Sequence, residues 1–125
     1  MKIMLTMASS KHHSWIKMQL QIYLDELSQY ALVKKNYDGL YDYPYLEHYW
    51  REPDRHAFII EKKDEATGFL LVREDLNPID GTFINEIAEL YILPAFRQHS
   101  VATCAVKILL SYFSGSWRVA VFRNN

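Results

Sequence analysis

Apolar residues recur along the chain with two different periods, and the change of period predicts where strands and helices lie. Residues 2–8 predict a short strand, with Ile3, Leu5 and Met7 on one face. Ser9 and Ser10 follow as candidate helix N-caps, and beyond them the spacing of apolar residues changes to three and four. The predicted helix has an apolar face made of Ile16, Leu20, Tyr23, Leu24, Leu27 and Ala31.

The middle of the chain combines a turn-rich segment with a predicted hairpin. Residues 36–45, NYDGLYDYPY, are dense in turn formers and tyrosines, and residues 46–51 form a candidate short helix. Two apolar runs, HAFIIE at 56–61 and GFLLVRE at 68–74, flank a charged turn and are typical of paired strands. A loop at 75–82, punctuated by Pro and Gly, leads into the next strand.

The remaining residues predict a strand, a helix and a second strand. Residues 86–93 are typical of a largely buried strand that opens near Phe83 and ends at Pro94, which cannot donate to a ladder. Gly115 is expected to end the helix, because Gly is the usual residue just past a helix C-terminus, and 117–122 is a β-branched and aromatic run. The helix between these strands is expected to begin at Val101, and its apolar face comprises Val101, Ala105, Ile108, Leu109 and Tyr112.

Composition narrows the class of protein. The 125 residues suit one domain over 1–125, and half of them are hydrophobic, as in a globular chain. The net charge of −1 gives no bulk attraction to nucleic acid or to an anionic membrane. No apolar run is long enough to span a membrane and the lone Cys104 excludes a disulfide framework, so a cytoplasmic location is the default expectation. Because the adjacent His12 and His13 point apart on a helix, we expect no metal site there.

The segment before the last predicted helix resembles a known cofactor loop. Residues 97–102, RQHSVA, are similar to the pyrophosphate loop of the GNAT superfamily of N-acetyltransferases. That signature is Arg or Gln, two free positions, Gly, one free position, and then Gly or Ala. The preceding AELYILPAFR is similar to the strand and the Pro-aromatic-Arg lead-in of the same motif. On the loop alone, a solvated basic turn before an ordinary helix is the alternative interpretation.

The order of elements along the whole chain agrees with this resemblance. Strand, helix, short helix, three strands, helix and strand is the GNAT order through its fifth strand, and the chain looks most like a bacterial group of small acetyltransferases without generally assigned acceptors. The resemblance implies an α/β, GNAT-like acyl-CoA N-acyltransferase fold: a mixed, mostly antiparallel central sheet flanked by helices and shortened at its C-terminus. It also implies acetyl-CoA as co-substrate, bound by Leu90, Tyr91, Ile92, Arg97, Gln98, His99, Ser100, Val101, Ala102 and Asn125.

Two features depart from the family's pattern. Ser100 stands where the motif asks for Gly, whose missing Cβ lets the backbone approach phosphate and adopt unusual dihedral angles; Ser is instead a good helix N-cap. The sequence ends at the expected cofactor contact Asn125, with Asn124 as its alternative, before the helix that often supplies a tyrosine acid in the family. The fifth strand, 117–122, is then an uncovered edge, and we expect a second copy, or some other chain, to cover it.

Acetyl transfer to an amine needs a base, a polarised thioester carbonyl and a leaving thiolate that is protonated or stabilised. By resemblance, backbone N–H groups near Tyr91 and Ile92 would polarise the carbonyl. Glu86 and Glu89 are candidate bases; being three positions apart in a strand, they are expected to point to opposite faces, so at most one would face the cleft. Tyr91 is a candidate acid, although a core tyrosine is the commoner case. The tyrosines of 36–45 are candidates for the acceptor-binding wall.

These observations favour an acetyl-CoA-dependent N-acetyltransferase that acts on an amine of a small molecule or a protein. The alternative is a catalytically inactive, shortened GNAT-fold binding or interaction protein, with or without CoA; a truncated reading frame of an ordinary enzyme is a third. The catalytic candidates are Glu86, Glu89 and Tyr91. We expect a homo-oligomer formed through the C-terminal strand, and no nucleic-acid or membrane partner.

Overall fold

The structure is a computed structural model of the chain, and it describes residues 2–30, 33–97 and 100–119. The order of its strands and helices matches the order predicted from the hydrophobic pattern. The elements are β1 (Ile3–Met7), η1 (Ser10–His12), α1 (His13–Leu27), α2 (His48–Arg51), β2 (Arg55–Lys62), β3 (Glu65–Leu76), β4 (Phe83–Ile92), η2 (Pro94–Phe96), α3 (Val101–Tyr112) and β5 (Ser116–Val119).

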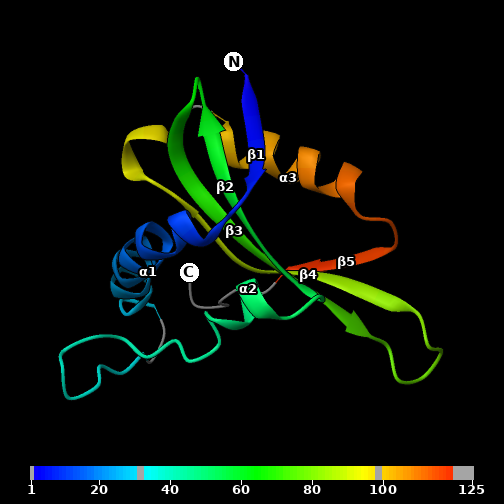
Figure 1. Cartoon of the computed structure of the whole chain (residues 1–125), viewed down its shortest axis with the longest axis horizontal. Helices are drawn as coiled ribbons and strands as arrows, with labels where there is room; N and C mark the ends of the chain where they lie inside the picture. The colour runs from blue at the N-terminus through cyan, green and yellow to red at the C-terminus, as the bar shows by residue number, and fades with distance from the viewer. Residues whose placement is uncertain (1, 31–32, 98–99, 120–125) are drawn as a thin grey trace.

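The described strands form one mixed sheet in the order β1-β2-β3-β4-β5. The first four strands pair antiparallel, and β5 pairs parallel to β4. Because parallel neighbours need a crossover connection, α3 links β4 to β5 across one face of the sheet, while α1 and α2 lie against the other face (Figure 1). This is the mixed, mostly antiparallel sheet flanked by helices that the sequence predicted.

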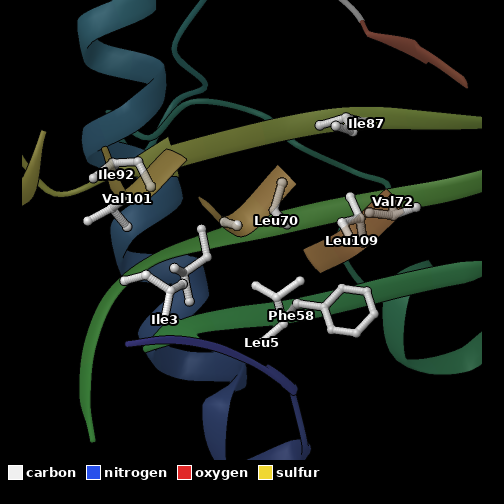
Figure 2. Packing of buried hydrophobic residues seen from close by; sticks show 11 residues of the cluster. Ile3, Leu5, Phe58, Leu70, Val72, Ile87, Ile92, Val101 and Leu109 are labelled. Carbon is white, nitrogen blue, oxygen red and sulfur yellow. The ribbon is translucent and has the colours of Figure 1, made fainter. Parts of the chain in front are cut away.

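Two apolar cores, one on each face, hold the helices to the sheet. The central strands β2 and β3 contribute to both cores, which explains why their sequences are almost continuously apolar. Figure 2 shows the core beneath α3, which comprises Ile3, Leu5, Phe58, Ile60, Leu70, Val72, Ile87, Ile92, Val101, Ala105 and Leu109. The core beneath α1 and α2 comprises Ile16, Leu20, Leu24, Tyr41, Leu46, Tyr49, Ala57, Ile59, Phe69, Leu71 and Tyr91.

A β-bulge in β4 changes which side chains share a face. In the pairing of β3 with β4, Leu71 lies opposite Glu89 but Val72 lies opposite Ile87, so Ala88 is an extra residue on β4. The prediction that Glu86 and Glu89 point to opposite faces is therefore wrong, since the extra residue shifts the alternation by one. Both carboxylates lie on the face covered by α1 and α2, where they line one cleft.

The end of α3 also differs from the prediction. The helix ends at Tyr112 and its C-cap, Phe113, is extended, so Gly115 is not the residue that ends it. Gly115 has φ of +102° and comes directly before β5, where its backbone conformation turns the chain back towards the sheet. The predicted strand at 117–122 is described as far as Val119; the rest of it lies outside the described residues.

Candidate active site

A first cleft lies where the end of α1 faces the C-terminal end of β4 and the start of α3. It has a volume of about 490 Å³. Its lining residues are Tyr23, Glu26, Leu27, Tyr30, Leu90, Tyr91, Ile92, Arg97 and Ala102. Of the predicted cofactor contacts, the cleft brings together Leu90, Tyr91, Ile92, Arg97 and Ala102. Ser100 does not line it, and Val101 is instead buried in the core beneath α3. Among the predicted contacts, Gln98, His99 and Asn125 lie outside the described residues.

The backbone of β4 offers hydrogen-bonding groups to this cleft. The Leu93 N–H donates to the Thr67 carbonyl at 2.8 Å, whereas the Ile92 carbonyl accepts from Arg97 at 2.8 Å on the other side. Because backbone groups alternate in direction along an antiparallel strand, the N–H groups of Leu90 and Ile92 point away from β3. The described β4–β5 ladder ends at the Ile87–Val119 pair, so no described strand pairs with β4 at these two residues.

Ser100 adopts the backbone conformation that explains the Gly of the family motif. Its φ of 58° and ψ of 23° are left-handed, a region that costs a residue with a Cβ about 1–2 kcal/mol. Its side chain makes no capping hydrogen bond, so Ser100 stands at the N-cap position without the hydroxyl contact that makes Ser a favoured cap. The N-terminus of α3, with its unpaired N–H groups, faces the cleft through Ala102.

Arg97 ties the loop after β4 to α1. Its Nη2 lies 3.0 and 2.9 Å from the two carboxylate oxygens of Glu26, and its guanidinium lies 5.4 Å from the centre of the Tyr91 ring. The side chains of Arg97 and Glu26 are 42% and 40% exposed. An ion pair this exposed contributes little to stability, so an anionic ligand can compete for Arg97 at small cost.

A second cleft of about 370 Å³ lies on the same face of the sheet, beside the bulge in β4. Its lining residues are Tyr43, Tyr45, Tyr49, Arg55, Arg73, Glu86, Ala88 and Glu89. Tyr23 connects the two clefts, because its ring lines the first while its hydroxyl donates to Glu89 Oε1, in the second, at 3.0 Å.

The Glu89 carboxyl is largely buried, and burial opposes its ionisation. Burial raises the pKa of the Glu89 carboxyl above its ordinary value, although hydrogen bonds from the hydroxyls of Tyr23 and Tyr43 act in the opposite direction. Burial and the nearby Glu89 charge also raise the pKa values of Tyr23 and Tyr43. Both phenols therefore stay neutral and act as hydrogen-bond donors to the carboxylate.

Glu86 lies in the same cleft but in the opposite electrostatic environment. Burial disfavours its charge, yet hydrogen bonds from Arg118 and Arg73 outweigh burial and lower the pKa of Glu86. Arg73 Nε lies 2.6 Å from Glu86 Oε1, and Arg118 holds the other carboxylate oxygen as well as Asp75, at 2.5 Å. The network joins β3, β4 and β5, and it leaves Glu86 ionised and fully engaged.

Tyr91 is buried between the first cleft and the α1 core. Its hydroxyl lies 3.4 Å from Glu26 Oε1, and its ring makes an edge contact with Tyr23 at 5.6 Å. Burial and the Glu26 charge raise the pKa of Tyr91 above its ordinary value. The phenol is therefore a weaker acid than an ordinary tyrosine.

The turn-rich segment contributes two of its tyrosines to the second cleft. Tyr43 and Tyr45 line it, whereas Tyr41 packs on α1 and donates to Asp25 at 2.7 Å, and Tyr37 is fully exposed. The sequence missed the site residues Tyr23, Glu26, Tyr49, Arg55 and Arg73. Their only sequence signal is a polar or aromatic side chain beside an apolar run, which many surface positions share.

Two further findings concern the described residues as a whole. Within 2–30, 33–97 and 100–119, no group of three or more His, Cys, Asp or Glu side chains is placed to hold a metal ion. In the same ranges, no helix has both the length and the apolar character needed to cross a membrane.

Comparison with protein families identifies the class to which this fold and site belong. The model of the Acetyltransferase (GNAT) family matches residues 19–122, which is most of the chain. The chain therefore belongs to the GNAT acetyltransferase family. A comparison with curated proteins finds no significant match.

Solved structures of acetyltransferases share the fold over nearly the whole chain. A possible acetyltransferase from Clostridium difficile superposes with a TM-score of 0.76 at 11% identity, covering 98% of this chain and 82% of that one. A predicted acetyltransferase from Clostridium acetobutylicum, solved with acetyl-CoA, gives 0.72 at 11% identity, with the same coverage of 98% and 82%. A ribosomal-protein-alanine N-acetyltransferase from Brucella melitensis gives 0.68 at 13% identity, covering 100% and 85%. At these identities the likeness shows the fold alone.

Proposed function

We propose that this protein is an acetyl-CoA-dependent N-acetyltransferase that acts on the amine of a small molecule or a protein, with Glu89 as its general base. The observation that carries this proposal is the position of Glu89 at the bulge of β4. There its carboxylate faces a tyrosine-lined cleft, and Tyr23 links it to the cleft at the open end of β4. Glu89 combines a raised pKa with hydroxyl partners that leave it free to accept a proton, whereas Glu86 in the same cleft is engaged by two arginines.

The first cleft fits acetyl-CoA. The outward N–H groups of Leu90 and Ile92 suit an amide-containing pantetheine arm and the thioester carbonyl, and Leu27 and Leu90 supply apolar contact. The N-terminus of α3 suits the pyrophosphate, because its unpaired N–H groups and helix dipole favour anions. Arg97 would exchange its exposed contact with Glu26 for a phosphate oxygen.

The reaction follows from the placement of these groups. The acceptor ammonium gives a proton to Glu89, directly or through a water, and the free amine attacks the thioester carbonyl. The new C–N bond forms as the C–S bond breaks, and the sulfur leaves as the thiolate of CoA. The nitrogen then gives its second proton to that thiolate, which leaves a neutral amide and free CoA thiol. An ordinary thiol has a pKa of about 8.5, so Tyr91, whose pKa is raised above that of an ordinary phenol, is a poor proton donor to it. We therefore assign Tyr91 to the wall of the cleft, and Glu86 to the network that supports the second cleft.

Release of free thiol in the presence of amines tests the proposal. Glu89→Gln keeps an acceptor for the Tyr23 and Tyr43 hydroxyls but cannot take a proton, so we expect turnover to fall about 100-fold or more. Acetyl-CoA binding should be unchanged, and Glu65→Gln, on an exposed residue at the β2–β3 turn, is the matched control. Equal turnover by Glu89→Gln and wild type would exclude Glu89 as the base.

The alternative function, a fold that binds CoA or a partner without catalysis, has one structural observation in its favour. Ser100 holds a left-handed conformation without a compensating side-chain contact, at the point where the motif asks for Gly. This weakens the loop without removing the rest of the cleft. Saturable binding of acetyl-CoA with no thiol release from any amine would favour this alternative.

A further inference from the structure

We propose that the second cleft takes a small acceptor that carries an anionic carboxylate as well as its amine, with Arg55 binding the carboxylate and Glu89 receiving the amine. The inference rests on the proposed acetyl transfer, and it names the class of acceptor. It follows from the way in which the charges of this cleft are paired.

Arg55 is the cation of the cleft that the described residues leave uncompensated. Arg73 is engaged by Glu86, whereas Arg55 makes no ion pair or side-chain hydrogen bond in the part of the chain that the structure describes. Its guanidinium lies 5.7 Å from the centre of the Tyr49 ring. Arg55 also lies directly opposite Arg73 across β2 and β3, an arrangement in which like charges repel. An anion bound on the sheet face between the Arg55 and Arg73 side chains would relieve that repulsion.

The second uncompensated charge of the cleft is the negative charge of Glu89. Glu86 is neutralised by Arg73 and Arg118, so it presents little net charge to a ligand. Glu89 is held only by hydroxyl groups among the described residues, so its charge is uncompensated. The cleft therefore offers one free positive and one free negative group, and a zwitterion with an ammonium and a carboxylate matches both. A simple polyamine would place a second cation against Arg55.

The walls and size of the cleft suit a small molecule. A volume of about 370 Å³ is at the lower end of small-ligand sites, and the rings of Tyr43, Tyr45 and Tyr49 form its sides. A planar guanidinium stacked beside an aromatic ring is preorganised for a carboxylate, which it binds through two parallel hydrogen bonds. The carboxylate of the acceptor takes no part in the reaction: the amine loses its proton to Glu89, the C–N bond forms, the C–S bond breaks, and the product is an N-acetylated acid.

Matched pairs of amines test the inference. The pairs are leucine and isoamylamine, phenylalanine and phenethylamine, and 5-aminopentanoate and butylamine, whose members differ by the carboxylate alone. We expect at least one carboxylated member to give kcat/KM for thiol release about 10-fold or more above its partner. Since the carboxylate also alters the basicity of the amine, the decisive comparison is between wild type and Arg55→Gln. This variant should raise KM for the carboxylated member by a larger factor than it changes KM for the plain amine, so that the preference for the carboxylated member is lost.

Two controls and a binding assay complete the experiment. Arg55→Lys should restore part of the preference, and Arg51→Gln, on an exposed residue of α2, should change nothing. Calorimetric binding of the same pairs to the protein saturated with CoA gives a readout that does not need turnover. The inference is overturned if no carboxylated member reacts or binds better than its partner, or if Arg55→Gln affects both members equally. Arg55-dependent binding of a carboxylated amine without thiol release would support the acceptor class and overturn acetyl transfer. Thiol release with plain amines alone would support acetyl transfer and overturn the acceptor class.

Discussion

At the residue scale, two carboxylates three positions apart in one strand have opposite chemistry. Glu86 receives hydrogen bonds from two arginines, which lower its pKa and keep it ionised. Glu89 accepts hydrogen bonds from neutral hydroxyl groups and burial raises its pKa, so it holds its proton to a higher pH than an ordinary glutamate does. The difference comes from the neighbours that each side chain meets, because both are glutamates on the same strand.

The raised pKa of Glu89 predicts the pH dependence of turnover. The base must be ionised to accept a proton, so kcat/KM should rise with pH through the pKa of Glu89 and lose that limb in Glu89→Gln. The contribution of Glu89 to the free energy of unfolding should instead fall as pH rises. A folded-state pKa above the unfolded value stabilises the protein at low pH, and this contribution is lost as pH rises through the folded pKa. Thermal unfolding of Glu89→Gln should therefore lose less stability than wild type over that interval; a steeper loss would contradict the assigned shift.

Ser100 gives a second prediction at this scale. Ser100→Gly should relieve about 1 kcal/mol of left-handed strain, offset in part by the larger backbone entropy of unfolded Gly, and should tighten acetyl-CoA binding. Ser100→Asp should fold, because Asp tolerates the left-handed region, yet repel the phosphates of the cofactor. Calorimetric titration with acetyl-CoA measures both effects. If Ser100→Asp bound acetyl-CoA as well as wild type, the loop would not hold the pyrophosphate.

At the element scale, the bulge in β4 organises the site. By adding Ala88 to one strand, it places Glu86 and Glu89 on the same face and brings the latter beneath Tyr23 of α1. Beyond the bulge, the N–H groups of Leu90 and Ile92 point to the side away from β3. One extra residue thus positions both the proposed base and the groups that face the cofactor.

The Glu86 network predicts a structural role for that residue. It links β3, β4 and β5 through Arg73 and Arg118, so Glu86→Gln should leave two arginines close together and destabilise the protein by about 1–3 kcal/mol. The folded pKa of Glu86 lies below its unfolded value, so this contribution is present at neutral pH and is lost as pH falls through the folded pKa. Urea denaturation at pH 7 measures the loss. An unchanged free energy of unfolding would show that the arginines find other partners.

The elements themselves follow from the sequence to a large extent. The apolar patterns predicted the strands and α-helices in order, though not the short 3-10 helices η1 and η2, and the motif at 97–102 predicted one side of the first cleft. The bulge at Ala88 was not predicted, because it depends on how β4 pairs with β3 and the pattern of β4 alone does not reveal it. Arg55 and Arg73 were missed for the same reason: they become neighbours only when β2 and β3 pair.

At the scale of the whole molecule, one face of the sheet carries an apolar core and the other carries the proposed site. The face beneath α3 is filled with apolar, mostly aliphatic side chains (Figure 2), whereas the face beneath α1 and α2 carries the second cleft and most of the first. β4 lines both clefts, whereas α1 lines the first and reaches Glu89 in the second through the Tyr23 hydroxyl. The proposed base and the cofactor groups are therefore carried by elements that pack directly on each other.

The edge of the sheet gives a prediction about assembly. β5 is the last of the described strands, and Val119 is 54% exposed on it. We expect a second copy to pair along this edge, since an open apolar strand favours pairing with another chain. Val119→Lys should then shift the protein towards monomer in analytical ultracentrifugation. A wild-type monomer at all concentrations would refute this assembly.

The proposed function, the class of acceptor and the behaviour of Ser100 all require acetyl-CoA to bind in the first cleft. Thermal unfolding at increasing concentrations of acetyl-CoA tests this requirement most directly. A ligand at about 100 times its dissociation constant stabilises the folded protein by roughly 2.7 kcal/mol, so the account predicts a clear, saturable rise in the unfolding midpoint. An unchanged midpoint in a cooperatively folded protein would contradict it.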